Sequence, residues 1–375
     1  MIKKTSFMPS LSPRNSAKEQ LRRRVETMHW KPGMRLPSEA RLAETLGISR
    51  PSIHRAVREL ESEGLIVSKT GSRNRYIRTL GSGVRTGVIG LLHIDRTALT
   101  HPAMQQRLAG IEEVLREKGL RLRIEVSDHD SSEWEPLPSL DSLCELCRGI
   151  DGLIVKWGDT DYSPLTRVSA LLPVVVNGFE SLGPRVAGVR FDREHAFFML
   201  ADELLKQGHR EIVRLGLPES AEVGRTEATG LRVAIRRPEY VNMASYRSVE
   251  VSHHKEDLGR RAMEKEIEKG RLPTALICSS DSLARGALDV LGKANIEVPR
   301  DVSVVCFGSK PPAFELPRPL TYVRVDFREE GRLTALALLR MMSENSDESH
   351  ERWPKTIFVA GSFMEGHSVA PPRKQ

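Results

Sequence analysis

Polar and cationic side chains cluster on one face of a short segment in the first sixth of the chain. Arg50, Ser52, His54, Arg55 and Arg58 fall on this face, and apolar residues at helical spacing form the opposite one. Hydroxyl, imidazole and guanidinium groups near the start of a helix are suited to reading base edges in the major groove of DNA. These residues therefore indicate DNA recognition. The alternative is a solvated pair of helices with ordinary surface arginines.

Two helices separated by a tight turn are expected to position these side chains. The stretch 37–60 carries apolar residues at helical spacing on both sides of Gly47, and glycine tolerates the backbone of a turn. Ser38 and Ser49 stand where helix N-caps are expected, and Pro51 fits the first turn of the second helix. The pattern predicts a helix-turn-helix.

A basic hairpin is predicted directly after the second helix. Residues 65–77 read as two short strands around a polar turn that contains glycine. Lys69, Arg73 and Arg75 make this hairpin basic, so it is suited to lie along phosphates or to probe a minor groove. With a further helix before the helix-turn-helix, residues 16–78 are predicted to form a winged helix of the α+β class.

The run PGMRLPSEARLAETLGISRPSIHRAVRELESEGLIVSKTGS resembles the head of the GntR family of bacterial transcription regulators. The resemblance implies base or phosphate contacts from Arg50, Ser52 and His54, and from the wing tip near Thr70 and Gly71. His54 stands where the family usually has arginine, and a histidine contact would be weaker and sensitive to pH. The complete set of candidate DNA-binding residues is Ser38, Arg41, Ser49, Arg50, Ser52, His54, Arg55, Lys69, Thr70, Gly71, Arg73 and Arg75.

Charge is distributed unevenly along the 375 residues, whose formal net charge is +7. Residues 1–80 hold 17 Lys and Arg against 7 Asp and Glu, whereas the remaining 295 residues hold 40 and 43. A basic head on a near-neutral body places polyanion binding in the head. Apolar runs are shorter than a membrane span, the N-terminus lacks the pattern of a secretory signal, and four cysteines suggest no disulfide framework. We therefore expect a cytoplasmic protein.

The rest of the chain alternates strand and helix patterns. Residues 1–15 are expected to be a flexible arm and 79–85 a flexible linker, because neither shows a regular apolar period. Short continuous apolar runs within 86–375 alternate with amphipathic helices, which favours parallel, doubly wound α/β sheets. The strands are too many for one sheet, so two lobes are expected, with a ligand at the carboxyl ends of strands in the cleft between them.

A second resemblance, to the effector domain of LacI/GalR-type regulators, is carried by four segments: GVIGLLHIDRTALTHPAMQQRLAGIEEVLREKGLRL, GHREIVRLG, PTALICSSDSLARGALDVLGKANIEVPRDVSVVCFG and PRPLTYVRVDF. A GntR-type head on such a periplasmic-binding-protein-like body resembles the arabinose-responsive repressors. The resemblance implies a homodimer and a small effector. It places the first lobe at 86–178 and 318–345, and the second at 179–317 and 346–375.

The expected pocket positions depart from those of the LacI/GalR-type relatives. Glu227 stands where relatives have an arginine, and Gly308 replaces a ligand-binding aspartate. These changes would reverse local charge, so three effectors stay open: an atypical, cationic small molecule, an ordinary sugar held by rearranged residues, or none in a vestigial pocket. The candidate effector-binding residues are His101, Met104, Lys156, Trp157, Asn177, Arg225, Glu227, His254, Ser280 and Asp281.

Other reactive residues lack the partners that chemistry needs. Cys144 and Cys147 form a CxxC pair on a predicted helix with no second pair for zinc. His253 and His254 have no further ligand at metal spacing in their segment. No metal, cofactor or catalytic constellation is therefore expected.

The sequence as a whole predicts a DNA-binding transcriptional regulator, most readily a repressor, that is not an enzyme. Its partners would be a roughly palindromic operator, a second copy of the chain and a small effector. Two alternatives stay open: a GntR-type head on an aminotransferase-like pyridoxal-phosphate domain, or a DNA-binding protein with a vestigial sensor.

Overall fold

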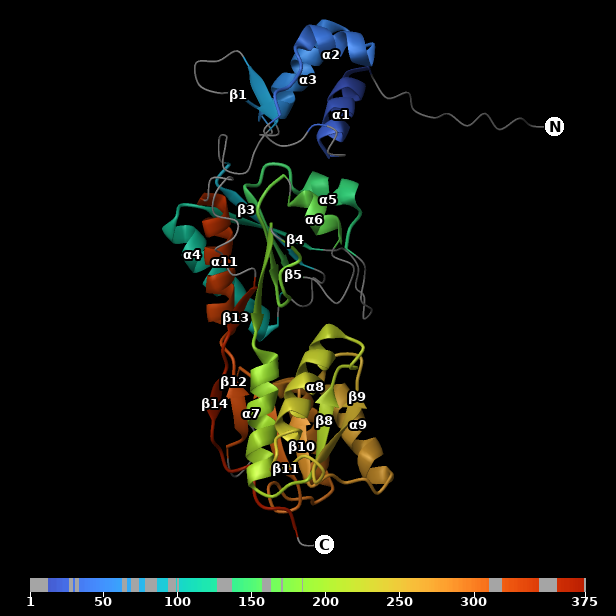
Figure 1. Cartoon of the computed structure of the whole chain (residues 1–375), viewed down its shortest axis with the longest axis vertical. Coiled ribbons are helices and arrows are strands. Elements are labelled where there is room, and N and C mark those ends of the chain that lie inside the picture. The colour runs from blue at the N-terminus through green and yellow to red at the C-terminus, as the bar shows by residue number, and fades with distance from the viewer. Residues whose placement is uncertain are drawn as a thin grey trace, which may run out of the picture. The chain divides into compact units, whose positions relative to one another are not determined.

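The computed structural model of the chain describes residues 13–26, 30, 34–62, 66–68, 74–77, 86–93, 99, 101–126, 137–156, 163–169, 171–183, 185–309, 319–343 and 356–373 (Figure 1). The predicted linker and residues 1–12 of the predicted arm lie outside these residues. The chain divides into two compact units. The first unit holds Met1–Thr100, Ala109–Val189 and Arg332–Ile357, and the second holds His101–Leu108, Arg190–Gly331 and Phe358–Gln375.

The N-terminal part of the first unit folds as three helices and a two-stranded wing. The helices are α1 (Pro13–Glu26), α2 (Glu39–Leu46) and α3 (Arg50–Ser62), and the strands β1 (Ile66–Ser68) and β2 (Arg75–Ile77) pair antiparallel. Ser38 caps α2 as predicted, and Gly47 ends that helix with a φ of 64°, a left-handed conformation that glycine adopts without strain. Leu21, Leu42, Ile53, Leu60 and Ile77 share one buried cluster, which holds these elements together.

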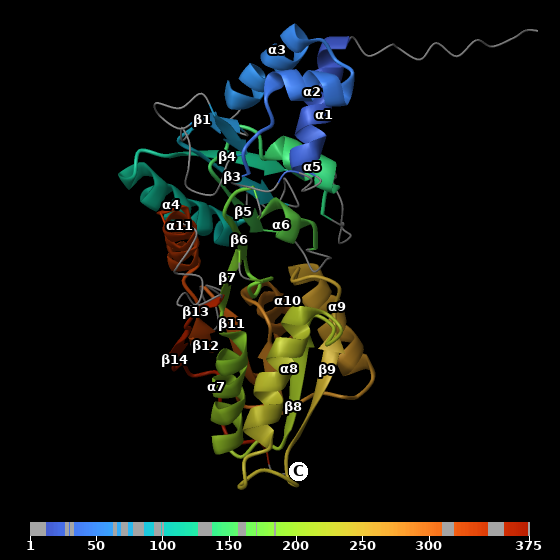
Figure 2. The same ribbon diagram turned by 45° about the horizontal axis from the view of Figure 1, so that its top comes forward.

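A six-stranded sheet forms the centre of the body's first unit. Its strand order is β13-β7-β6-β5-β3-β4, with β3 (Val88–His93), β4 (Arg121–Val126), β5 (Gly152–Lys156), β6 (Val174–Asn177), β7 (Val186–Phe191) and β13 (Thr356–Val359). The pairs from β4 through β7 are parallel. Helices α5 (Leu140–Leu146) and α6 (Ser163–Val168) pack on β5 and β6 in one buried cluster. Helices α4 (Pro102–Glu117) and α11 (Phe327–Ser343) run beside each other in both views (Figures 1 and 2).

A second six-stranded sheet forms the centre of the second unit. Its order is β14-β12-β11-β10-β8-β9, with β8 (Glu211–Gly216), β9 (Ser245–Glu250), β10 (Ala275–Cys278), β11 (Ser303–Gly308), β12 (Thr321–Arg324) and β14 (Ser362–Met364). All pairs are parallel except β12 with β14. The order reverses after β9, and right-handed crossovers then put α9 (Glu256–Glu268) and α10 (Asp281–Lys293) on the face opposite α7 (Arg193–Lys206) and α8 (Glu222–Ile235) (Figure 2).

The chain crosses between the units at other positions than predicted. Residues 318–345 were assigned to the first lobe, but β12 pairs with β11 in the second sheet, and the chain leaves the second unit only after Gly331. Residues 346–375 were assigned to the second lobe, yet β13 belongs to the first sheet. Likewise β7, placed in the second lobe, pairs with β6 in the first sheet. The predicted crossing points were wrong, because strand pairing, which is non-local, decides sheet membership.

Candidate functional site

Helix α3 presents the polar face that the sequence predicted. Its inner residues Ile53, Ala56, Val57 and Leu60 are buried, which fixes the orientation of the helix in the head. Arg50, His54 and Arg55 are exposed on the other side, and the partly exposed Ser52 lies 2.9 Å from Ser49, between the hydroxyl oxygens. A row of donors at the N-terminal end of an exposed helix is the arrangement that major-groove reading requires.

One carboxylate joins this recognition face to the wing. Glu39 of α2 lies 2.9 Å from Nδ1 of His54 and accepts a 2.6 Å hydrogen bond from Nη1 of Arg75. Arg75 also donates from Nε to Glu61 at 2.9 Å. Burial alone would raise the pKa of Glu39, but the hydrogen bonds from His54 and Arg75 hold it below its ordinary value. Arg75 therefore fixes the wing against α2 and α3, besides any contact with phosphate.

The remaining predicted DNA contacts divide into two groups. The Ser38 side chain accepts a hydrogen bond from the backbone N–H of Arg41, so its first role is to cap α2, and Arg41 is exposed. The wing-tip residues lie outside the described part of the chain: Lys69, Thr70, Gly71 and Arg73.

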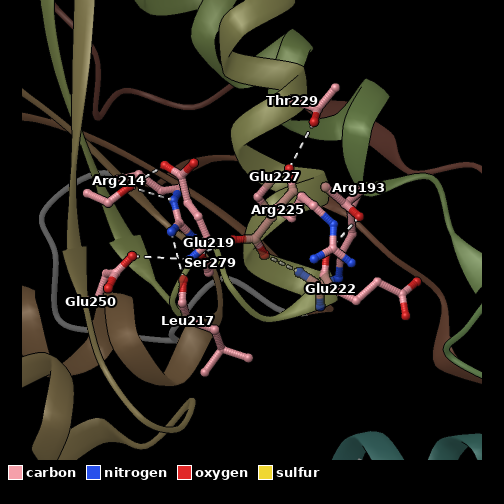
Figure 3. Close-up of polar contacts among 12 residues, drawn as sticks. Arg193, Arg214, Leu217, Glu219, Glu222, Arg225, Glu227, Thr229, Glu250 and Ser279 are labelled. Atoms are coloured by element: carbon pink, nitrogen blue, oxygen red, sulfur yellow. Dashed lines mark hydrogen bonds and ion pairs between the residues drawn. The ribbon is translucent and has the colours of Figure 1, made fainter. Parts of the chain in front are cut away.

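In the second unit, a buried ion-pair cluster lies where strands β8 and β10 end (Figure 3). Glu227 of α8 is fully buried and pairs with two arginines: Nη1 of Arg214 at 2.8 Å and Nη1 of Arg193 at 2.6 Å. The Ser279 hydroxyl donates to the same carboxylate at 2.6 Å. Arg214 is itself fully buried, and its Nη2 donates to the backbone carbonyl of Leu217 at 2.7 Å.

This cluster changes the interpretation of Glu227. The sequence suggested that its carboxylate reverses the charge of the pocket, but two guanidinium groups compensate that charge inside the protein. The local balance is therefore cationic, and the reason for expecting a cationic effector is removed. Sequence reasoning missed Arg193, Arg214 and Ser279. Arg214 carried a signal, because a charged residue inside the apolar strand run IVRLG needs a buried partner.

Asp281 occupies the space that Gly308 leaves open. A Cβ atom at position 308 would lie 2.4 Å from the Asp281 carboxyl carbon, so an aspartate there would clash with it. Asp281 begins α10, which Ser280 caps by accepting from the N–H of Leu283, and its Oδ2 accepts from the N–H of Ser309 at 3.1 Å. The carboxylate that the resemblance places on β11 is thus supplied at the same sheet edge by α10.

His254 lies beside the two arginines of the cluster. Its Nε2 is buried and has no hydrogen-bond partner among the described residues. Burial, with the positive charges of Arg193, Arg214 and His253, lowers the pKa of His254 to about 3. A neutral imidazole with a buried, unsatisfied nitrogen can bind a hydroxyl or an amide.

We expect this histidine to make the folded state sensitive to acid. Between its ordinary pKa of 6.5 and about 3, His254 takes up a proton only in the unfolded chain, so the free energy of unfolding falls as pH falls. Replacing it by asparagine should remove about 2 kcal/mol of the loss between pH 6.5 and pH 5. Urea denaturation across this range measures the effect, and His195→Asn, on the exposed surface of α7, is the control. Parallel profiles for all three proteins would contradict the expectation.

The other predicted effector residues do not all join this cluster. Arg225 is exposed on α8, His101 is exposed before α4, and Met104 is buried. In the first unit, buried Asn177 donates from Nδ2 to Thr334 at 2.7 Å, and its Oδ1 has no partner among the described residues. Lys156 Nζ lies 5.7 Å from the centre of the Phe179 ring. Trp157 lies outside the described residues. Glu227, His254, Ser280 and Asp281 belong to the second unit, and Lys156 and Asn177 to the first.

The cysteine pair offers no reactive thiol. Cys144 of α5 and its C-cap Cys147 are buried and form no disulfide, and burial raises the pKa of Cys147 to about 12. Among the residues that the structure covers, no group of three or more His, Cys, Asp and Glu side chains could hold a metal. No helix in the same part of the chain is long and apolar enough to cross a membrane.

Both the head and the body of the chain match known families of protein domains. Residues 13–75 match the family model of bacterial regulatory proteins of the GntR family, and residues 201–363 match that of a periplasmic-binding-protein-like domain. The chain combines a GntR-type head with a periplasmic-binding-protein-like body. The predicted fold class is thereby confirmed, and the aminotransferase alternative is not supported, because the matched body domain is of another kind.

Two transcriptional repressors and one solved repressor structure are similar to this chain. The arabinose metabolism transcriptional repressor of Geobacillus stearothermophilus is 27% identical over 84% of this chain and 87% of its own length. The HTH-type transcriptional repressor MelR of Bacillus subtilis is 30% identical over 57% of this chain and 64% of its own. The Lac repressor dimer bound to operator and the anti-inducer ONPF has a TM-score of 0.61 and 18% identity over 77% of this chain and 96% of its own, which shows a shared fold.

Proposed function

We propose that this protein is a cytoplasmic transcriptional repressor whose GntR-type head binds an operator and whose periplasmic-binding-protein-like body binds a small effector. The observation that carries the proposal is the exposed polar face of α3, with Arg50, Ser52, His54 and Arg55 at its N-terminal end. The basic balance of the head supports binding to a polyanion. The arabinose repressor, which matches along most of both chains, supports the assignment as a repressor.

We further propose that the protein acts as a homodimer on a roughly palindromic operator. Two copies related by a two-fold axis present two recognition helices, so the half-sites should be inverted repeats. The similar fold of the Lac repressor dimer bound to operator supports this proposal. Effector binding would change operator affinity by a coupling free energy of about 1–3 kcal/mol.

The effector that the site favours is sugar-like. In the second unit, Arg193 offers a partly exposed guanidinium, His254 a neutral imidazole and Asp281 a carboxylate. All three lie near the carboxyl ends of the strands of the second sheet. Mixed donors and acceptors of this kind suit hydroxyl groups. The arabinose repressor supports the same class of ligand. A cationic effector has no uncompensated carboxylate at Glu227 to bind.

Operator binding should depend steeply on salt. A dimer that contacts about 6–10 phosphates loses about 10³–10⁵-fold in affinity between 50 and 200 mM salt. The experiment selects binding fragments from a random DNA pool and measures fluorescence anisotropy over this range. We expect an inverted repeat and a steep slope. Selection of no sequence, with weak binding at 50 mM salt, would count against the repressor assignment.

Thermal melting with a panel of pentoses, hexoses and amino sugars tests the effector. A ligand at about 100 times its dissociation constant should add about 2.7 kcal/mol to the free energy of unfolding. The shift should disappear in Asp281→Asn and persist in Arg225→Gln, because Arg225 is exposed outside the ion-pair cluster. Absence of a shift across the panel would favour the vestigial sensor.

A further inference from the structure

A groove of about 600 Å³ lies at the open edge of the second sheet. We call it the β9 edge groove. Its volume falls in the range of small-molecule sites, which is about 300–1,000 Å³. Its lining comes from β9, α9 and the loops that follow them: Arg247, Ser248, Val249, Glu250, Val251, Ser252, Leu258, Arg261, Ala262, Lys265, Glu266, Lys269 and Arg271.

The lining places this groove along the edge of β9. Six consecutive residues of one strand and its end, 247–252, reach the groove, although successive side chains of a strand point to opposite faces. A groove touched by both sets must run along the strand's side. In the sheet order β9 is the last strand (Figure 1), and among the described residues it pairs with β8 alone. Alternate backbone N–H and C=O groups on its outer side are therefore directed toward the groove.

The wall opposite β9 is cationic. Arg261, Lys265 and Lys269 recur every fourth residue on and after α9, so they share one helix face, and Arg271 follows from the next loop. Lys265, Lys269 and Arg271 have no ion pair with any residue that the structure describes, and all three are exposed. Arg261 lies 3.9 Å from Asp257, at the limit of an ion pair.

The two acidic residues in the lining do not balance these cations. Glu266 is buried and pairs with Arg247 at 2.5 Å, and Arg247 donates in addition to the backbone carbonyl of Arg271 at 3.1 Å. Glu250 accepts from the N–H of Glu219 at 3.1 Å. One guanidinium is thus held in place by Glu266, while four further cationic side chains surround the space. Val249, Val251 and Leu258 pack against the core and give the groove an apolar floor.

We propose that the β9 edge groove binds a small organic anion that carries two or more phosphate or carboxylate groups. The exposed cations would pair with its charges, and the outward N–H groups of β9 would donate to its oxygens. The volume exceeds what one inorganic phosphate fills, and the apolar floor would carry its carbon skeleton. The lining of this groove includes none of the residues of the proposed sugar site, which are Arg193, His254 and Asp281, and the proposal does not depend on the repressor assignment.

Titration calorimetry of the full chain at low salt, with pyrophosphate and glucose 6-phosphate as probes and glucose as the uncharged comparison, tests the proposal. We expect saturable binding of one anion per chain. Binding of glucose would belong to the proposed sugar site, so the double substitution below should leave it unchanged. The double substitution Lys265→Glu and Lys269→Glu should weaken anion binding at least tenfold. The control Lys293→Glu, at the corresponding end of α10 and outside the groove, should leave it unchanged.

The proposal fails if neither anion binds. It also fails if the double variant binds them as the unchanged protein does, because the anion would then bind elsewhere, for example at Arg193. It also fails if the double variant keeps anion binding but loses affinity for DNA, because the cations would then serve a nucleic acid. Melting without ligand reports folding. If the double variant does not fold, Arg271→Gln, which alters one exposed side chain, takes its place and should weaken binding several-fold.

Discussion

Replacing Glu227 by alanine should lower the free energy of unfolding by about 3–5 kcal/mol. Among the described residues, Glu227 is the only carboxylate that pairs with Arg214, which is fully buried, and the substitution removes it. The guanidinium would then keep the Leu217 carbonyl and the Ser248 hydroxyl as partners, and neither carries a charge. Arg193 would lose its 2.6 Å partner as well. Urea denaturation followed by circular dichroism measures the loss.

The matched control is Glu222→Ala on the same helix. Glu222 also pairs with an arginine, Arg190, at 2.8 Å, but its side chain is 24% exposed. A partly exposed pair at a helix start contributes about 1 kcal/mol. If both substitutions lower the free energy of unfolding by the same amount, the buried cluster contributes no more to stability than a partly exposed ion pair. Glu227→Gln should fall between them, because its amide oxygen can still accept from one of the two arginines, whereas the NH2 group that replaces the other oxygen cannot.

Replacing Arg50 by alanine should weaken operator binding by about 30-fold to about 10⁴-fold. A base or phosphate contact of this kind contributes about 1–3 kcal/mol of binding free energy, and a dimer loses it twice. Arg50 begins α3 and is exposed, so its loss removes no packing from the head. Anisotropy at one fixed salt concentration measures the change.

Arg58→Ala provides the control for this prediction. Arg58 is an exposed arginine on the same helix, two turns beyond Arg50, so the substitution removes the same charge far from the N-terminal end. It should reduce affinity modestly and similarly for all DNA sequences. Equal losses for the two variants, on operator and random DNA alike, would show that α3 does not read bases through its N-terminal residues.

Local signals predicted the head and non-local pairing limited the prediction of the body. Ser38 as a cap, Gly47 as a turn and the apolar period of α3 each depend on a few neighbouring residues, and each was found as predicted. The sheet that β12 joins depends on a strand more than ten residues away, across a segment outside the described residues. Strand β9 (Ser245–Glu250) was missed because an edge strand with partly exposed faces lacks a continuous apolar run.

The candidate sites followed the same division. The exposed residues of α3 could be predicted because the helix period alone assigns their face. The partners of Glu227 could not, because Arg193 lies 34 residues before it on another helix and Ser279 lies 52 residues after it. Such partners come together only through the sheet order. A charged residue within an apolar strand run therefore indicates that a buried partner exists, but it does not identify that partner.

The burial of all four cysteines has a practical consequence for studying this protein. Cys144, Cys147, Cys278 and Cys306 are buried and form no disulfide, and burial raises the pKa of the latter two thiols well above the ordinary range. Thiol-specific probes react with the thiolate, so these four sites should stay unlabelled in the folded protein. A single cysteine introduced at exposed Glu44 on α2 would then carry the only spin label of each head. In a dimer, the distance between the two spin labels would measure directly how an effector changes the separation of the heads.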